Sequence, residues 1–280
     1  MQKPSISPDK LSSPRSDRDY VTALARGLEV IRAFGPDRTE MTLAEVAVAT
    51  GQSAATSRRY LHTLRQLGYV AAYGRKFMLR SKVLEFGSSF WGAHGLERVA
   101  QDHLLSIVDK VDDSASLAVL EGPDVLYIAH VARHRTVRMA AGVGSRFPAY
   151  ATALGRTLLA SGGDEAIAHY LATTPLVALT ERTQTDPKRL RTILERVRKD
   201  GYAAIEDELD YGIASVATPI IVQGRVIAAV NSSSNSARRS LKALVEERLE
   251  LLRATAAAIG RELERSPALV HALSLNGGST

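Results

Sequence analysis

The sequence predicts an α+β protein of two domains, with a small basic helical module ahead of a larger domain built on an antiparallel sheet. Three observations predict this class. The chain has 280 residues, which suits two domains of ordinary size. Helical and turn signals fill the first third, whereas β-rich runs and helical periods follow one another later. Residues 1–90 carry 14 Lys and Arg against 8 Asp and Glu, while the remainder is balanced.

Composition excludes several classes of protein. The hydrophobic share of 45% and the charged share of 24% are those of a globular chain, not of a disordered one. No apolar run is long enough to cross a bilayer, and the polar N-terminus lacks the apolar stretch of a signal peptide. The absence of cysteine excludes disulfides, a thiolate nucleophile and cysteine-ligated zinc. We therefore expect a soluble, cytoplasmic protein that does not bind membranes.

Residues 20–82 are expected to form a winged helix-turn-helix domain behind a disordered arm of residues 1–19. The first helix covers residues 20–34, in which apolar residues recur at three- and four-residue steps. Gly35-Pro36 ends it. The charge excess of this third of the chain indicates a module that binds a polyanion, although a basic surface can also be merely solvated.

Two short helices complete the motif. Thr42 and Glu45 have the spacing of a capping box, which opens one helix that Gly51 ends. Ser53 caps the other helix, which runs to Leu67. Two short helices around a glycine-containing turn are typical of a helix-turn-helix.

The second of these helices has two different faces. At 100° per residue its leucines fall on one side and its basic residues on the other. A basic face can enter the major groove, where Arg pairs with guanine O6 and N7, and small residues at the helix start allow a close approach. The alternative is an ordinary amphipathic helix with a solvated basic face. The candidate DNA-binding residues here are Ser53, Ala55, Thr56, Arg58, Arg59, His62 and Arg65.

A hairpin is expected to follow as the wing. Residues 69–73 and 77–79 are short strand candidates, and the tip between them holds Arg75 and Lys76. These two cations are expected on the sugar-phosphate backbone, where contacts position a protein without selecting sequence. Arg26 and Thr42 are further candidates for phosphate contacts.

Residues 83–100 are expected to form a linker helix. Glycines predict a break around residues 92–95. Leu84, Phe86, Phe90 and Trp91 are more apolar than a free linker needs. This stripe predicts packing against a second copy of the chain, with packing inside the same chain as the equal alternative.

Residues 101–266 are expected to form the second domain, and residues 267–280 a small polar tail that frays. Strands are expected over residues 116–120, 125–132, 137–141, 202–208, 215–222 and 225–233. Helices are expected over residues 153–161, 165–172, 187–200 and 241–265. This order indicates an α+β domain with an antiparallel sheet.

A binding site is more strongly indicated than a catalytic one. The chain lacks the HExxH, GxSxG and P-loop patterns, and His130 and His134 have no third ligand beside them, so we expect neither an enzyme nor a metal or cofactor. The loop at 146–156 runs into a helix whose first turn offers N–H groups to an anion. An acidic cluster at 206–210 and the strand end at 231–233 add polar groups that suit a small molecule, although each is also plain turn chemistry.

Several segments resemble, in order, those of the IclR-type bacterial transcriptional regulators. The match covers about residues 20–265 and is carried by ALARGLEVIRAFG (23–35), TLAEVAVATG (42–51), SRRYLHTLRQLGYV (57–70), VLEFG (83–87), GSRFPAYATALGRTLLASG (144–162), DELDYGIASVATPI (207–220) and GRVIAAVNSSS (224–234). The segments RFPAY, TALGR and DELDYG look most like the branch that controls catabolism of aromatic acids through protocatechuate or 4-hydroxybenzoate. The resemblance implies a GAF-like effector domain and a dimer or a dimer of dimers.

The resemblance also implies which residues contact the effector. They are Tyr150, Ala151, Thr152, Asp207, Glu208, Ser215, Asn231 and Ser233. Two positions depart from the pattern: Ala214 replaces an Arg frequent in the aromatic-acid branch, and Ser232 replaces a usual apolar residue. Arg138 and Arg146 are then the candidates to bind an effector carboxylate.

The resulting hypothesis is a sequence-specific transcriptional regulator controlled by a small effector, with aromatic or carboxylic acids as the expected class. A homodimer or larger homo-oligomer would bind a palindromic operator in double-stranded DNA, with RNA polymerase as a candidate partner. Two alternatives remain. One is an enzyme acting on a small acid and targeted by its basic domain, and the other is a constitutive DNA-binding assembly protein without a ligand.

Overall fold

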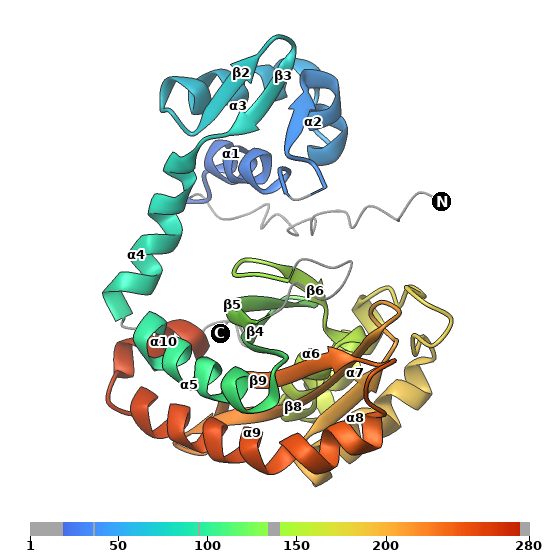
Figure 1. The fold of residues 1–280 in the computed structure, drawn as a ribbon. Coiled ribbons are helices and arrows are strands. Elements are labelled where there is room, and N and C mark those ends of the chain that lie inside the picture. Colours follow the sequence, from blue (N-terminus) through green and yellow to red (C-terminus); the bar gives the residue numbers. More distant parts are fainter. Residues whose placement is uncertain (1–18, 36, 95, 134–140, 275–280) are drawn as a thin grey trace. The chain divides into compact units, whose positions relative to one another are not determined.

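The chain divides into two compact units, Met1–Phe90 and Trp91–Thr280, and each is described by itself. The computed structural model describes residues 19–35, 37–94, 96–133 and 141–274 (Figure 1). Both the helix-turn-helix in the first unit and the antiparallel sheet in the second confirm the predicted α+β class.

The N-terminal unit is a winged helix-turn-helix. Its buried core comprises Val30, Met41, Val46 and Leu61, together with other apolar side chains. The sheet has the order β1-β3-β2 and is antiparallel. Its elements are α1 (Thr22–Arg32), β1 (Glu40–Thr42), α2 (Leu43–Thr50), α3 (Ala54–Gln66), β2 (Val70–Tyr73) and β3 (Lys76–Leu79). The sequence did not predict β1, whose three residues are too few to show a periodicity and are ordered by pairing with β3.

Local sequence signals fix the ends of α2 and α3. Thr42 accepts a hydrogen bond from the Glu45 amide, and Glu45 accepts one from the Thr42 amide, so the predicted capping box is present. Gly51 ends α2 with φ +63°, a conformation that costs glycine nothing. Ser53 caps α3 by accepting from the Thr56 amide.

The predicted linker consists of separate helices. A 3-10 turn, Ser81–Val83, leads into α4 (Leu84–His94), and α5 (Leu96–Val111) follows, so the predicted break is confirmed. Phe86 stacks on Tyr69 at 5.2 Å between ring centroids, which anchors the start of α4 to the wing. Leu84 and Phe86 nevertheless remain 68% and 56% exposed.

The C-terminal unit is built on a six-stranded antiparallel sheet of order β6-β5-β4-β9-β8-β7. The strands are β4 (Ser114–Glu121), β5 (Asp124–Ala132), β6 (Arg146–Pro148), β7 (Ala203–Glu206), β8 (Ile213–Val222) and β9 (Arg225–Asn235). The sequence did not predict β6, because a three-residue strand ending in proline looks like part of a loop.

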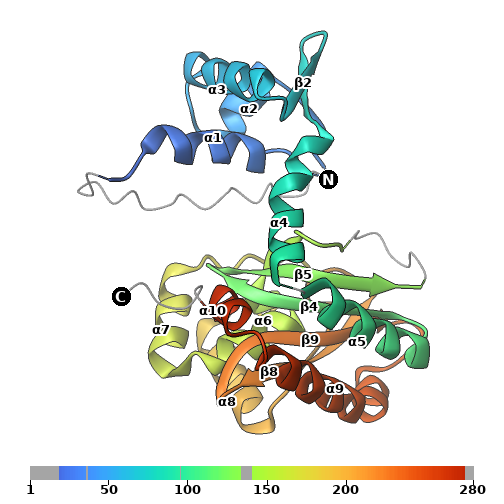
Figure 2. The ribbon, with the colours of Figure 1, turned by 90° about the vertical axis from the view of Figure 1, so that its left-hand side faces the viewer.

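Helices cover both faces of this sheet (Figure 2). On one face α6 packs over Ala118, Ala217 and Ala229, with α7 and α8 behind it. On the other face lie α5 and α9. The helices are the 3-10 turn Ala149–Ala151, α6 (Ala153–Ser161), α7 (Gly163–Thr173), α8 (Pro187–Asp200), α9 (Leu241–Leu263) and α10 (Pro267–Ser274).

The prediction of a frayed tail was wrong over residues 267–274. These residues form α10, which buries Leu269 and Leu273 to 1% and 4% exposure. A helix of two turns is too short for its period to stand out in a polar context. Residues 275–280 and nearly all of the expected strand 137–141 lie outside the described residues.

Gly155 on α6 permits a close approach of the preceding turn to the helix. A Cβ atom placed there would lie 2.2 Å from the carbonyl oxygen of Ala149. The turn before α6 can therefore fold against the helix only because residue 155 has no side chain.

Gly155→Ala is expected to destabilise the C-terminal unit by about 1–3 kcal/mol, because backbone atoms must move to make room. Urea denaturation followed by circular dichroism measures this. The matched control is Gly87→Ala on α4, where a Cβ would meet nothing within 4 Å. An equal loss of stability in both variants would contradict the steric argument.

Candidate nucleic-acid interface and effector site

Helix α3 presents its basic side chains to solvent. Arg58, Arg59, His62 and Arg65 are all exposed, as is Ala55 near the helix start. No hydrogen bond or ion pair of these four basic side chains is found within the described residues. The predicted basic face is therefore available for an outside partner.

The opposite side of α3 is buried. Leu61 is fully buried and Leu64 is 8% exposed, and both belong to the core with α1 and α2. Ser57 is also fully buried, and its small side chain leaves room for the neighbouring helices. The predicted division of α3 into an inner and an outer face is confirmed.

The hydroxyl groups predicted near the interface serve first as helix caps. Ser53 Oγ donates to Thr56 Oγ1 at 2.9 Å and accepts from the Thr56 amide. Thr42 Oγ1 donates to Glu45 Oε2 at 2.8 Å. Arg26 lies exposed on α1.

The wing carries two cations with different surroundings. Lys76 forms an ion pair with Glu40 on the neighbouring strand, and this hydrogen bond raises the pKa of Lys76. Glu45 adds a second negative charge nearby. Arg75, at the exposed tip, makes no ion pair within the described part of the chain. Carboxylates therefore offset the charge of Lys76, and Arg75 is the stronger candidate to bind phosphate.

Tyr73 was missed by the sequence analysis. It is 79% exposed and stands beside the turn at Gly74, opposite Lys76 in the hairpin. A large aromatic group left exposed at a wing tip was a usable signal, since such exposure often marks a contact surface.

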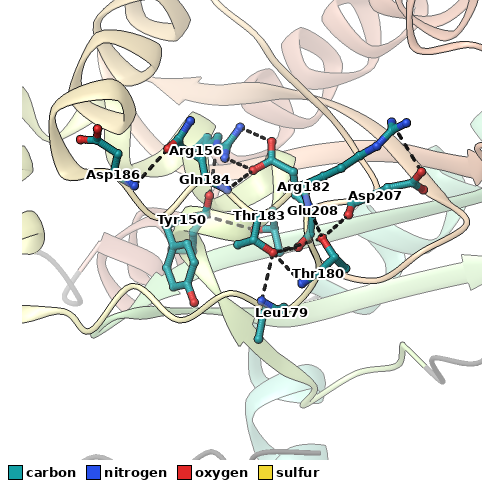
Figure 3. Close-up of polar contacts among 12 residues, drawn as sticks. Tyr150, Arg156, Leu179, Thr180, Arg182, Thr183, Gln184, Asp186, Asp207 and Glu208 are labelled. Carbon is teal, nitrogen blue, oxygen red and sulfur yellow. Dashed lines mark hydrogen bonds and ion pairs between the residues drawn. The ribbon is translucent and has the colours of Figure 1, made fainter.

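In the C-terminal unit a buried ion pair joins two of the predicted effector segments (Figure 3). Arg156 on α6 donates two hydrogen bonds to the Glu208 carboxylate, at 2.7 and 2.5 Å, and a third to the Tyr150 carbonyl at 2.8 Å. The Arg156 side chain is 3% exposed and that of Glu208 13%. Glu208 also accepts from the Gln184 amide. Its charge is thus used inside the protein.

Tyr150, Ala151 and Thr152 are buried where they were predicted, at the entrance to α6. Tyr150 Oη donates to the Val177 carbonyl at 2.7 Å and accepts from the Val177 amide at 3.0 Å. Burial raises the pKa of Tyr150. Thr152 Oγ1 accepts from the Gly155 amide at 2.9 Å and so caps α6.

Asp207 is held by the turn that it forms. It has φ +57°, and its Oδ1 accepts from the Gly212 amide and from Ser236 Oγ, both at 2.8 Å. Its carbonyl accepts from Thr180 Oγ1 at 2.6 Å. This fixes the acidic turn against the loop between α7 and α8 (Figure 3).

The first turn of α6 keeps free backbone donors. The Ala153 and Leu154 amides have no acceptor among the described residues, because the Thr152 side chain caps only Gly155. Both residues are at most 1% exposed. Such a turn is suited to an anion.

Ser215, Asn231 and Ser233 meet on the sheet face under α6. Asn231 Nδ2 donates to Ser215 Oγ at 3.0 Å and to Ser233 Oγ at 3.1 Å. Asn231 is 3% exposed, and its Oδ1 has no hydrogen-bond partner in the part of the chain that the structure describes. The three residues predicted together thus form one cluster with one unused acceptor.

Of the two arginines predicted to bind an effector carboxylate, the structure describes only one. Arg146 donates to Asp124 at 3.3 Å and to the Glu121 carbonyl at 2.7 Å, so its guanidinium is engaged within the fold. Arg138 lies outside the described residues.

Ser232, which departs from the family pattern, faces the other side of β9. Arg248 on α9 donates to Ser232 Oγ at 2.7 Å and forms an ion pair with Asp113. Arg248 is 1% exposed. Ser232 thereby serves as a partner for a buried cation, a role that sequence reasoning missed.

The described residues lack two further kinds of feature. No helix there is long and apolar enough to span a membrane, and no group of three His, Cys, Asp or Glu side chains could hold a metal ion.

Comparison with known proteins matches both units. The model of the IclR helix-turn-helix domain matches residues 23–72, and that of the C-terminal domain of the bacterial transcriptional regulator IclR matches residues 90–261.

Two curated relatives cover most of the chain. The Pca regulon regulatory protein of Pseudomonas putida is 39% identical over 238 residues, which are 84% of this chain and 82% of that protein. The p-hydroxybenzoate hydroxylase transcriptional activator of Acinetobacter baylyi is 34% identical over 85% of this chain and 90% of its own.

A solved structure is also similar to this chain over most of its length. The IclR homologue from Microbacterium hydrocarbonoxydans, crystallised with 4-hydroxybenzoate, superposes with a TM-score of 0.74 at 29% identity. The match covers 88% of this chain and all of that one.

Arg58→Ala is expected to weaken specific DNA binding by about 1–3 kcal/mol, the contribution of an arginine paired with a base. Fluorescence anisotropy with an operator duplex measures the affinity. Lys199→Ala, which removes an equal charge from the exposed side of α8, is the matched control and should have little effect. Equal losses in both variants would remove Arg58 from the interface.

Arg75→Ala is expected to lower the slope of log K against log salt by about 1, as loss of one phosphate contact does. Lys76→Ala should change the slope less, because Glu40 already pairs with that ammonium group. Salt titrations of both variants on nonspecific duplex provide the comparison. A larger change for Lys76→Ala would contradict this assignment.

Proposed function

Because the chain belongs to the IclR family of bacterial transcriptional regulators, we propose that a hydroxylated aromatic acid controls its binding to operator DNA. The family supports effector-controlled DNA binding by these two domains. The class of effector is the further step. It is supported by relatives named for the Pca regulon and for p-hydroxybenzoate hydroxylase, and by the homologue crystallised with 4-hydroxybenzoate.

The observation that carries the proposal is that two sets of polar groups without a hydrogen-bond partner among the described residues lie at α6: backbone donors in its first turn and a side-chain acceptor on the sheet beneath it. The α6 first turn offers the buried Ala153 and Leu154 amides, which suit a carboxylate. The Asn231 cluster offers a buried acceptor. A small molecule with an anionic group and a polar group would satisfy both.

The predicted contacts act at two levels in this proposal. Ser215, Asn231 and Ser233 contact the effector directly, as do the backbone groups of residues 151–154. Tyr150, Asp207 and Glu208 hold the surrounding loops, since their polar atoms are used in internal hydrogen bonds. Arg156 is the positioning residue that joins those loops.

The operator complex follows from the geometry of α3. We infer that a homodimer places two α3 helices in successive major grooves of a palindromic site, with Arg58, Arg59, His62 and Arg65 toward the bases and Arg75 toward a phosphate. The protein works in the cytoplasm, where its operator is found, and RNA polymerase is a partner at the promoter.

The proposal predicts that effector and DNA change each other's affinity. Operator affinity measured with and without saturating 4-hydroxybenzoate should differ by about 5- to 150-fold, the usual range of allosteric coupling. The ligand should also raise the unfolding temperature, because it binds the folded state.

Each alternative gives a different result in the same experiment. Absence of any ligand binding indicates the constitutive assembly protein without a ligand. A ligand that binds without changing DNA affinity contradicts the proposal, because a ligand that favours neither of two states cannot shift them. Chemical conversion of the ligand by the purified chain indicates an enzyme.

A further inference from the structure

The Asn231 side chain has a buried acceptor that lacks a donor. Asn231 is 3% exposed, and its Oδ1 makes no hydrogen bond to any described residue. A buried acceptor of this kind costs stability unless something donates to it, and native proteins rarely keep one without a reason. This acceptor therefore indicates that a bound ligand supplies the missing hydrogen-bond donor.

The hydrogen bonds of the neighbouring hydroxyl groups agree with the orientation of this amide. Ser233 Oγ donates to Ser215 Oγ at 3.0 Å, and Ser215 Oγ donates to the Ser232 carbonyl at 3.4 Å. In this arrangement both protons are committed, and the NH2 edge of the amide faces the two serines. The opposite edge is Oδ1, which can only accept.

The strand register extends the cluster into a row of neutral side chains. Ser116 on β4 pairs with Asn231 on β9, and His130 on β5 pairs with Ser116. Ser116 Oγ and His130 Nδ1 lie 2.9 Å apart, and His130 Nε2 has no partner among the described residues. Burial lowers the pKa of His130, so its ring is neutral near pH 7.

Small side chains lie next to this row. Ala118 lies two residues after Ser116 on β4, and Ala229 lies two residues before Asn231 on β9, so both face the same side of the sheet as the row. Ala217 on β8 pairs with Asn231. Tyr127 lies 6.5 Å from His130 between ring centroids. The surroundings are apolar and aromatic, as a ring-shaped ligand requires.

A carboxylate does not suit this row. The buried cations Arg156 and Arg248 are paired with Glu208 and Asp113, and the lone pairs of a carboxylate would meet those of Oδ1. A hydroxyl group has the proton that Oδ1 lacks.

We propose that the row of Asn231, Ser116 and His130 binds a hydroxyl group of the effector, with Asn231 Oδ1 as its acceptor. The row makes the protein select a hydroxylated ring over the same ring without the hydroxyl. This inference rests on the proposed function and assigns the two ends of the ligand, with the carboxylate at the start of α6.

Wild-type protein tests the inference with matched ligands. Isothermal titration with 4-hydroxybenzoate, benzoate and 4-fluorobenzoate is expected to give about 10- to 100-fold weaker binding for the two ligands without a donor. Equal affinity for all three would overturn the inference and leave the proposed function intact. Failure of all three to bind would overturn the proposed function itself, and this inference with it.

Variants place the preference on the row. Asn231→Leu should abolish the preference for the hydroxylated ligand by lowering the affinity for 4-hydroxybenzoate to that for benzoate. His130→Leu should reduce this preference. The control is Ser234→Ala, which alters another buried polar group on the opposite face of β9 and should keep the preference. A preference that survives in Asn231→Leu would overturn the assignment, and the fluorinated ligand keeps the test valid should that variant not fold.

Discussion

The function of this protein depends on the two-sidedness of α3. Leu61 and Leu64 bury one side among α1 and α2, and this packing leaves no rotation by which the basic side could turn inward. The four outer basic side chains have no acidic partner in the described chain, in contrast to Lys76 on the wing. A hydrophobic contact thus decides where charge is displayed. Removing the leucines would disorder the orientation of the arginines as well as the core.

In the C-terminal unit the buried charges are instead paired with one another inside the fold. Arg156 binds Glu208 and Arg248 binds Asp113, one on each side of the sheet. Loss of one partner from such a pair strands a buried charge, which costs about 3–5 kcal/mol. These pairs hold the loops and the strand ends around a neutral cluster. Selection of a ligand there has to rely on hydrogen-bond direction rather than on net charge.

Sequence reasoning succeeded where local signals are strong. The capping box, Gly51, the Ser53 cap and the faces of α3 depend on neighbours within a few residues, and all were predicted. It failed where order comes from contacts with distant residues: β1 and β6 are ordered by strand pairing, and α10 packs against β9 and α9. The same limit applies to the site. The types of residue at 215, 231 and 233 indicated ligand binding, but the partners of Glu208, Arg146 and Ser232 depend on contacts across the fold.

The most direct test of the account is protection of guanine N7 in operator DNA from methylation by dimethyl sulfate, since N7 lies in the major groove and is an atom that a bidentate arginine covers. The account predicts protected guanines in the operator when the protein is bound, and loss of that protection for some of them when Arg58 is alanine. Protection restricted to adenine N3 in the minor groove, or none at a concentration that saturates the operator, would contradict it.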